Sequence, residues 1–157
     1  MASPTATANP ASANAELYHA DGAAWAEETA QLLRERRFDE IDFDALVEEV
    51  EGLSQSNHDQ ADNRAGVLIA HILKWRYQPE RRSRSWIDTI AEQQFRIKKL
   101  FKRYPSVRRG ARLRWEETWA DGRELALDQT GLPKKAIPAE PDMTLDECLD
   151  AKFRLDD

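Results

Sequence analysis

Residues 43–76 read FDALVEEVEGLSQSNHDQADNRAGVLIAHILKWR, and this stretch decides the fold. On a helix, which turns about 100° per residue, its apolar side chains fall in one band about 120° wide. They are Phe43, Leu46, Val47, Val50, Leu53, Ala61, Leu68, Ile72 and Trp75. We therefore expect a long amphipathic helix packed on a core. One unbroken helix would be about 51 Å long at 1.5 Å per residue. Glycine and serine between Gly52 and Asn57 favour a break or kink there.

Residues that start helices lie on both sides of this stretch. Asp21 and Asp42 are each placed to cap a helix, because an aspartate side chain can accept from the first free backbone N–H groups. Pro79 ends the long segment. Ser85 with Asp88 has the spacing of a capping box and predicts a new helix from residue 85.

The C-terminal third shows one more long helix and a short one. Pro105 should open a helix that Gly131 closes in a left-handed conformation. Residues 133–142 hold three prolines and predict an extended strap, and Thr144 with Glu147 should cap a short terminal helix. No alternating strand pattern occurs in the sequence. The expected fold is all-α, an antiparallel bundle of four to five helices with a C-terminal strap and a short terminal helix.

Length and composition indicate a single globular domain. The chain has 157 residues, of which 41% are hydrophobic and 33% are charged. Residues 1–15 hold no charge and little to bury, so we expect a disordered N-terminal tail followed by one helical-bundle domain over residues 16–157. The single cysteine, Cys148, fits a reducing compartment. No secretory signal and no apolar run of about 18 residues is present, so the expected location is cytoplasmic, without a membrane partner.

Charge is divided unevenly along the chain, although the net value is only −6. Residues 1–66 carry a net −10, residues 67–114 carry +11 and residues 115–157 carry −7. The basic segment could attract anions. The favoured interpretation is that acidic and basic helices neutralise each other as neighbours in the bundle.

The connection over residues 74–86 concentrates guanidinium and aromatic groups between two helices. Its candidate anion- or partner-binding residues are Lys74, Arg76, Arg81, Arg82 and Arg84. Guanidinium groups bind phosphate and carboxylate through paired hydrogen bonds. The alternative is that these side chains clamp the acidic helices of the bundle itself. A second alternative is a nucleic-acid-associated factor that uses the basic block 74–114, with Arg96, Lys99 and Arg103 added to the same set.

Polar residues inside the apolar stripe suggest a candidate polar pocket. Arg64 and His71 lie seven residues apart near the core face, and Glu48 and Glu49 are acids that could pair with them. The structural interpretation is that such pairs fix the register of the helices. The functional interpretation is an enzyme with a pocket near His71 and Arg64. We identify no catalytic, metal-binding or cofactor-binding constellation, so a non-enzymatic protein is favoured.

The segment Lys74 to Trp86, KWRYQPERRSRSW, resembles the KW-x-YQPERRSRSW signature of a bacterial family catalogued as domain of unknown function 29. YHADGAAW at residues 18–25, LVEEVE at residues 46–51 and TGLP at residues 130–133 are similar to other parts of the family in the same order. Arg76 departs from the pattern, which usually has glutamine at this position. The resemblance implies an all-helical bacterial cytoplasmic protein and supplies no activity, cofactor or catalytic residue.

Together these observations predict a non-enzymatic helical interaction module that binds a protein or an anionic ligand through the 74–86 connection. The expected partner is another protein or a second copy of the chain, with nucleic acid as the less favoured alternative. Phe95 and Leu113 fall outside the core stripes of their helices, so we expect the strap or a partner chain to cover at least one of them.

Overall fold

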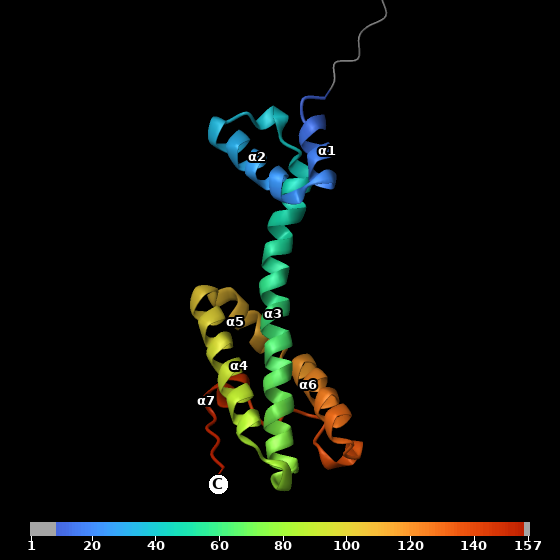
Figure 1. Ribbon diagram of the computed structural model, residues 1–157, viewed down its shortest axis with the longest axis vertical. Helices are drawn as coiled ribbons and strands as arrows, with labels where there is room; N and C mark the ends of the chain where they lie inside the picture. The colour runs from blue at the N-terminus through green and yellow to red at the C-terminus, as the bar shows by residue number, and fades with distance from the viewer. Residues whose placement is uncertain (1–8, 156–157) are drawn as a thin grey trace, which may run out of the picture. The chain divides into compact units, whose positions relative to one another are not determined.

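The computed structural model describes residues 9–155, and this part of the chain is helical without a strand (Figure 1). The all-α prediction is confirmed. The α-helices are α1 (Ser12–Ala20), α2 (Gly22–Glu35), α3 (Phe43–Tyr77), α4 (Arg84–Arg103), α5 (Pro105–Leu113), α6 (Trp115–Thr130) and α7 (Leu145–Asp150). Three 3-10 turns join them, η1 (Phe38–Glu40), η2 (Pro79–Arg81) and η3 (Lys134–Ala136). No described helix is long and apolar enough to span a membrane.

The chain divides into two compact units, residues 1–54 and residues 55–157. Helix α3 begins in the first unit and continues into the second. The expectation of one domain over residues 16–157 stays a prediction, because compactness does not say how many cooperative units unfold.

The first unit is organised around a buried asparagine. Asn14 is 2% exposed, and its amide donates to the Thr29 hydroxyl at 3.0 Å. Its carbonyl oxygen accepts from the Trp25 indole at 3.1 Å and from the Asp42 backbone N–H at 3.0 Å. These bonds join α1, α2 and the start of α3, which explains why the helix forms from Ser12. Disorder over residues 12–15 was therefore a wrong expectation, while residues 1–8 lie outside the described part.

Predicted caps position the next two helices of the first unit. The Asp21 carboxylate accepts from the backbone N–H groups of Ala23 and Ala24, both at 3.1 Å. The Asp42 carboxylate accepts from Asp44 at 3.1 Å and from Ala45 at 3.3 Å. Both carboxylates satisfy N–H groups that have no partner within their helices.

Helix α3 runs from Phe43 to Tyr77 as one helix of 35 residues. The predicted break between Gly52 and Asn57 does not occur, so the expectation of two separate helices is wrong, and a kink there stays a prediction. A glycine inside a helix costs only about 1 kcal/mol, whereas a break would leave several backbone groups without partners. Nothing lies within 4 Å of a Cβ built on Gly52, so no packing contact forces the chain to turn there.

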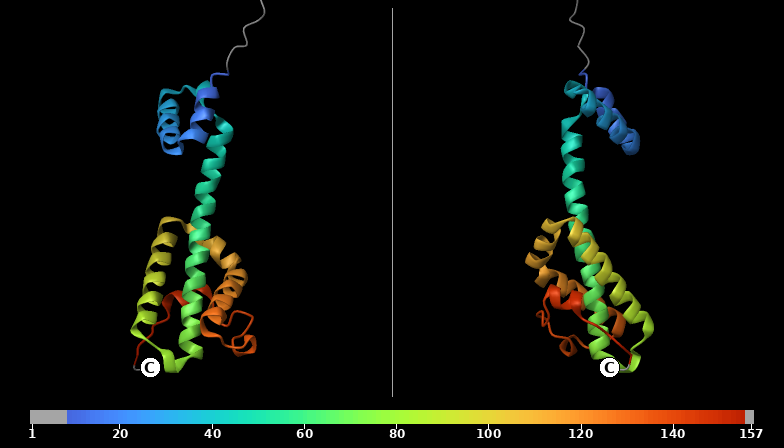
Figure 2. Two further views of the ribbon diagram at one scale, coloured as in Figure 1. Left: turned by 45° about the vertical axis from the view of Figure 1, so that its right-hand side comes forward. Right: turned by 90° about the vertical axis from the view of Figure 1, so that its left-hand side faces the viewer.

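The second unit packs α3, α4 and α6 around an apolar core, and the views in Figures 1 and 2 show α4 running antiparallel to α3. Fully buried members of this core include Leu68, Ile69, Ile72, Leu73, Ile90, Ile97, Trp119 and Cys148. Helices α3 and α6 approach closely at two glycines. A Cβ on Gly122 would lie 2.8 Å from the Gly66 carbonyl oxygen and 2.7 Å from the Ile69 Cβ. Glycine at position 122 therefore allows this contact between the two backbones.

Two predicted helix boundaries differ from the structure. The helix expected over residues 105–130 is divided at Arg114 into α5 and α6. Helix α4 begins at Arg84 with Ser83 at its N-cap, so Ser85 lies inside the helix and forms no capping box with Asp88, whose carboxylate accepts from the Arg84 guanidinium at 3.1 Å. With α1 and this division, the described residues hold seven α-helices rather than four or five.

The C-terminal segment follows its predicted signals. Gly131 is left-handed, with φ of 67°, and donates its N–H to the Leu127 carbonyl. Thr144 and Glu147 form the expected capping box at α7. The Gln94 amide holds the end of α7 by donating to the carbonyls of Cys148 and Ala151.

Candidate functional site

Lys74 in the 74–86 connection faces the interior of the second unit. Its side chain is 9% exposed, and its ammonium donates to the Gln129 side chain on α6 at 2.9 Å. The same ammonium lies 4.7 Å from the centre of the Trp86 ring, which allows a cation–π interaction. Burial lowers the pKa of Lys74. This residue therefore connects three helices.

Arg82 and Arg76 also bind groups of the second unit. The Arg82 Nε donates to the Trp75 carbonyl at 3.1 Å, and its guanidinium carbon lies 4.8 Å from the centre of the Trp75 ring. One Arg76 nitrogen contacts both carboxylate oxygens of Asp142 at 2.9 and 3.0 Å. The first contact fixes the turn after α3, and the second ties α3 to the strap.

Arg81 and Arg84 lie at the surface. Arg84 pairs with Asp88 one turn further along α4. Arg81 is exposed, and its side chain forms no hydrogen bond or ion pair with residues 9–155. Three of the five candidates therefore bind groups of the second unit and Arg84 pairs within α4, while anion binding by the connection stays a prediction.

Many other basic side chains of the block 74–114 pair with acidic side chains. Arg96 pairs with Glu92 at 2.8 Å, and Lys98 pairs with Asp150 at 2.8 Å. Arg108 and Arg112 share the two carboxylate oxygens of Asp146, at 2.7 and 2.6 Å, and lower the pKa of that acid. Arg103 lies over the Tyr104 ring and Lys99 is exposed. The geometry thus gives much of the block a structural role between α4, α5 and α7.

The residues of the predicted polar pocket belong to different units. Arg64 donates to the Gln93 side chain at 3.2 Å, and the His71 Nδ1 lies 2.9 Å from the Val67 carbonyl of its own helix. Burial lowers the pKa of His71. Glu48 and Glu49 are exposed in the first unit, where Glu49 accepts from the Tyr18 hydroxyl at 3.1 Å. The set is not gathered in either unit.

His58 lies beside an ion pair between α3 and the junction of α5 and α6. The Arg114 guanidinium binds Asp62 at 2.8 Å and lies 3.3 Å from the His58 Nδ1. Over residues 9–155, no three His, Cys, Asp or Glu side chains are placed to hold a metal ion.

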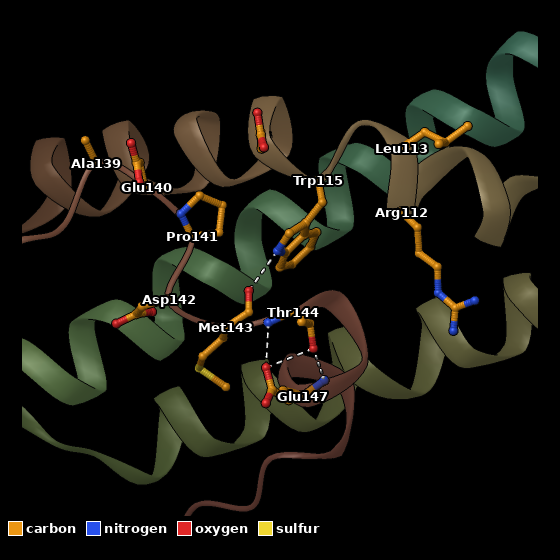
Figure 3. Close-up of a pocket in the computed structure, with 11 residues that line it drawn as sticks. Arg112, Leu113, Trp115, Ala139, Glu140, Pro141, Asp142, Met143, Thr144 and Glu147 are labelled. Atoms are coloured by element: carbon orange, nitrogen blue, oxygen red, sulfur yellow. Dashed lines mark hydrogen bonds between the residues drawn. The ribbon is translucent and has the colours of Figure 1, made fainter.

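A pocket of about 950 Å³ lies between the strap and the junction of α5 and α6 (Figure 3). The Trp115 indole donates to the Met143 carbonyl at 2.8 Å and holds the strap against α6. Leu113, at 83% exposure, belongs to the pocket lining, so the strap does not cover it. Phe95 is likewise 67% exposed, and coverage of either residue by a partner chain stays a prediction. Sequence reasoning missed this pocket, because a proline-rich strap does not reveal which helices it crosses.

The first half of α3 carries an exposed apolar face, which we call the α3 stripe. Its members are Phe43, Val47, Val50 and Leu53, with exposures of 49%, 53%, 57% and 67%. They occupy the same face of the helix as Ala61, Leu68 and Ile72, which are at most 1% exposed in the second unit. Sequence periodicity predicted the whole band as core, but only its second half is buried.

The lengths of the helices explain this difference. Helix α4 has 20 residues, whereas α3 has 35 residues and begins in the first unit. An antiparallel neighbour of that length can cover little more than half of α3. Acidic residues flank the stripe, and residues 43–57 contain no lysine or arginine. A row of large apolar groups exposed on one helix face is typical of a protein-binding surface.

Comparison with protein families finds a match to the family described as Domain of unknown function DUF29, over residues 17–154. Because this match covers most of the chain, the protein belongs to that family. Comparisons with curated proteins and with solved structures find no match.

Proposed function

We propose that this member of the DUF29 family is a non-enzymatic helical interaction module, and that it binds an α-helical segment of a protein through the α3 stripe. The observation that carries the proposal is the exposure of four large apolar side chains on one face of α3. Their spacing of three and four residues matches the contact face of a helix that packs on another helix.

The size of the hydrophobic contribution limits the kind of partner. Burying one Val, Leu or Phe side chain completely stabilises a complex by about 1.5–3 kcal/mol. The stripe residues are roughly half exposed, so together they can contribute about 3–6 kcal/mol. Association itself costs about 4–15 kcal/mol. A stable complex therefore needs a partner that contributes an apolar face of its own.

The other candidate surfaces support this proposal less well. Lys74, Arg76 and Arg82 already bind groups of the second unit, which leaves Arg81 and Arg84 for an anionic ligand. Many basic side chains of the 74–114 block form ion pairs with acidic side chains of the protein, which weakens the case for a nucleic-acid-associated factor. For an enzyme built on His71 and Arg64, the hydrogen-bond partners of these side chains are Gln93 and the Val67 carbonyl rather than glutamates of the predicted set.

Site-specific photocrosslinking in cells tests the proposal. A photoreactive phenylalanine analogue replaces Val50 on the stripe, and the matched control carries it at Gln55, which is exposed on the opposite face of the same helix. We expect a discrete crosslinked protein from position 50 that is absent from position 55. The added substitution Leu53→Asp should abolish it. Equal crosslinking from both positions, or none from position 50, would contradict the proposal.

A further inference from the structure

We propose that the pocket between the strap and the junction of α5 and α6 binds a basic peptide segment of a partner protein, which presents arginine or lysine side chains next to an apolar residue. All the residues that line this pocket belong to the second unit, and none belongs to the α3 stripe. Three observations carry the proposal: the size of the pocket, its exposed apolar lining and the sign of its uncompensated charge.

The pocket is a groove with an apolar lining. Its volume of about 950 Å³ is at the upper end of the range of ligand pockets, about 300–1,000 Å³, so it can hold far more than a single ion. Trp115 and Met143 line it from its two sides, and the hydrogen bond from the Trp115 indole to the Met143 carbonyl joins these sides (Figure 3). Leu113 is 83% exposed and adds a large apolar side chain that a partner can cover.

The charge of the lining is negative. The lining holds four acids and one base, a net charge of −3, and these residues are Glu116, Glu140, Asp142, Glu147 and Arg112. The single base is already neutralised, because the Arg112 guanidinium donates to Asp146 at 3.1 and 2.6 Å. Asp142 pairs with Arg76, and the Glu147 carboxylate accepts from Thr144 in the capping box of α7. The remaining two carboxylates set the chemistry of the site.

Glu116 and Glu140 are these two carboxylates. Both are exposed, and neither forms a hydrogen bond or an ion pair through its side chain with residues 9–155. Glu116 lies in the first turn of α6 and Glu140 lies in the strap, so each side of the groove contributes one carboxylate. Ionised carboxylates form their strongest hydrogen bonds with arginine and lysine. The same charge repels nucleic acid and anionic lipid.

The apolar lining distinguishes a peptide from a small organic cation. A short amine could reach the carboxylates, but it would leave Leu113 in water. A peptide in which basic and apolar residues are neighbours can contact the carboxylates and Leu113 together. Its apolar contact adds to ion pairs that are each weak at an exposed site. We therefore assign the groove to a peptide.

Selection of random twelve-residue peptides displayed on phage, with the full chain as the target, supplies the probe. We expect the enriched peptides to carry a net positive charge and to place an apolar residue beside arginine or lysine. The most enriched peptide is then synthesised with a fluorescent label, and its Kd is measured by fluorescence anisotropy. Spermidine at 1 mM, as the small organic cation, should not displace it. Displacement by spermidine, a selection that enriches no peptide, or enriched peptides without an excess of basic residues would overturn the proposal.

Variants of the two carboxylates place the bound peptide. The double variant Glu116→Gln, Glu140→Gln should raise the Kd about tenfold or more, because the charged acceptors are lost. The matched control Glu117→Gln, Asp121→Asn removes the same charge from exposed positions of α6 outside the lining and should raise the Kd less than about threefold. Circular dichroism of each variant checks that the helices still form. Equal increases in the two double variants would overturn the proposal.

Two single variants separate this groove from the α3 stripe. Leu113→Ser should raise the Kd about fivefold, whereas Val50→Asp should leave it unchanged. A peptide that loses binding to Val50→Asp but binds the Glu116→Gln, Glu140→Gln variant like the unchanged chain would occupy the α3 stripe. That result would overturn this inference and leave the proposed function standing.

Discussion

Replacement of Arg82 by alanine decides whether the 74–86 connection is mainly a structural clamp. The substitution removes the hydrogen bond from Nε to the Trp75 carbonyl, at 3.1 Å, and the guanidinium from its place 4.8 Å from the Trp75 ring centre. A hydrogen bond from a charged donor contributes about 1.5–3 kcal/mol. A partly buried cation–π contact contributes about 0.5–2 kcal/mol. We expect Arg82→Ala to lower the free energy of unfolding by about 2–4 kcal/mol.

Arg81→Ala is the matched control, because it removes the same charge one residue away from a side chain that is exposed and forms no hydrogen bond with residues 9–155. Its expected cost is below about 0.5 kcal/mol. Urea unfolding followed by circular dichroism measures both variants, and thermal unfolding should show a melting temperature about 5–15 °C lower for Arg82→Ala alone.

Sulfate provides the second arm of this experiment. If the connection were an anion site, 20 mM sulfate would raise the melting temperature of the unchanged chain but not of an Arg81→Ala, Arg82→Ala double variant. If the connection is a structural clamp, sulfate should change the melting temperatures of the unchanged chain and of the double variant by the same small amount. Equal costs for the two single variants, or a cost below 0.5 kcal/mol for Arg82→Ala, would refute the reasoning.

Three further predictions concern packing and pH. Asn14→Ala leaves the Trp25 indole and a backbone N–H without their acceptor and should cost about 2–5 kcal/mol in urea unfolding; a cost below 1 kcal/mol would show that water replaces the side chain. Gly122→Ala should destabilise by about 1–3 kcal/mol, because its Cβ meets backbone at 2.8 Å. Gly66→Ala should be neutral or stabilise by up to about 1 kcal/mol, since its nearest contact is 3.9 Å away, and equal effects in thermal melts would contradict this asymmetry. Arg108 and Arg112 lower the pKa of Asp146 in the folded protein. The contribution of Asp146 to the free energy of unfolding is therefore present above its unfolded pKa, near 4, and is lost as the pH falls through its lower folded pKa. Asp146→Asn should flatten the acid side of the profile of stability against pH, and an unchanged profile would argue against the ion pairs.

Local signals in the sequence predicted the helix ends well. The caps at Asp21, Asp42 and Thr144 and the left-handed Gly131 all act through residues one to four positions away. Such short-range chemistry can be read directly from the chain. The capping box at Ser85 failed because the helix begins earlier, at Arg84, with Ser83 at its N-cap.

Long-range features could not be read in the same way. Periodicity places Val50 and Leu68 on one face of α3, but it does not show that only the second is covered. That outcome depends on the length and direction of α4. The basic connection illustrates the same limit, because its composition fits either ligand binding or the internal contacts that Lys74 and Arg82 make.

Cys148 allows the opening of the second unit to be measured. Its side chain is fully buried, and burial raises the pKa of its thiol to about 12, so the native state offers almost no reactive thiolate to a labelling reagent. Modification must therefore wait for the segment that carries α7 to open. The labelling rate of the unchanged protein reports the frequency of that opening, without any engineered probe. Since the chain has no other thiol, every labelled molecule records an event in the second unit.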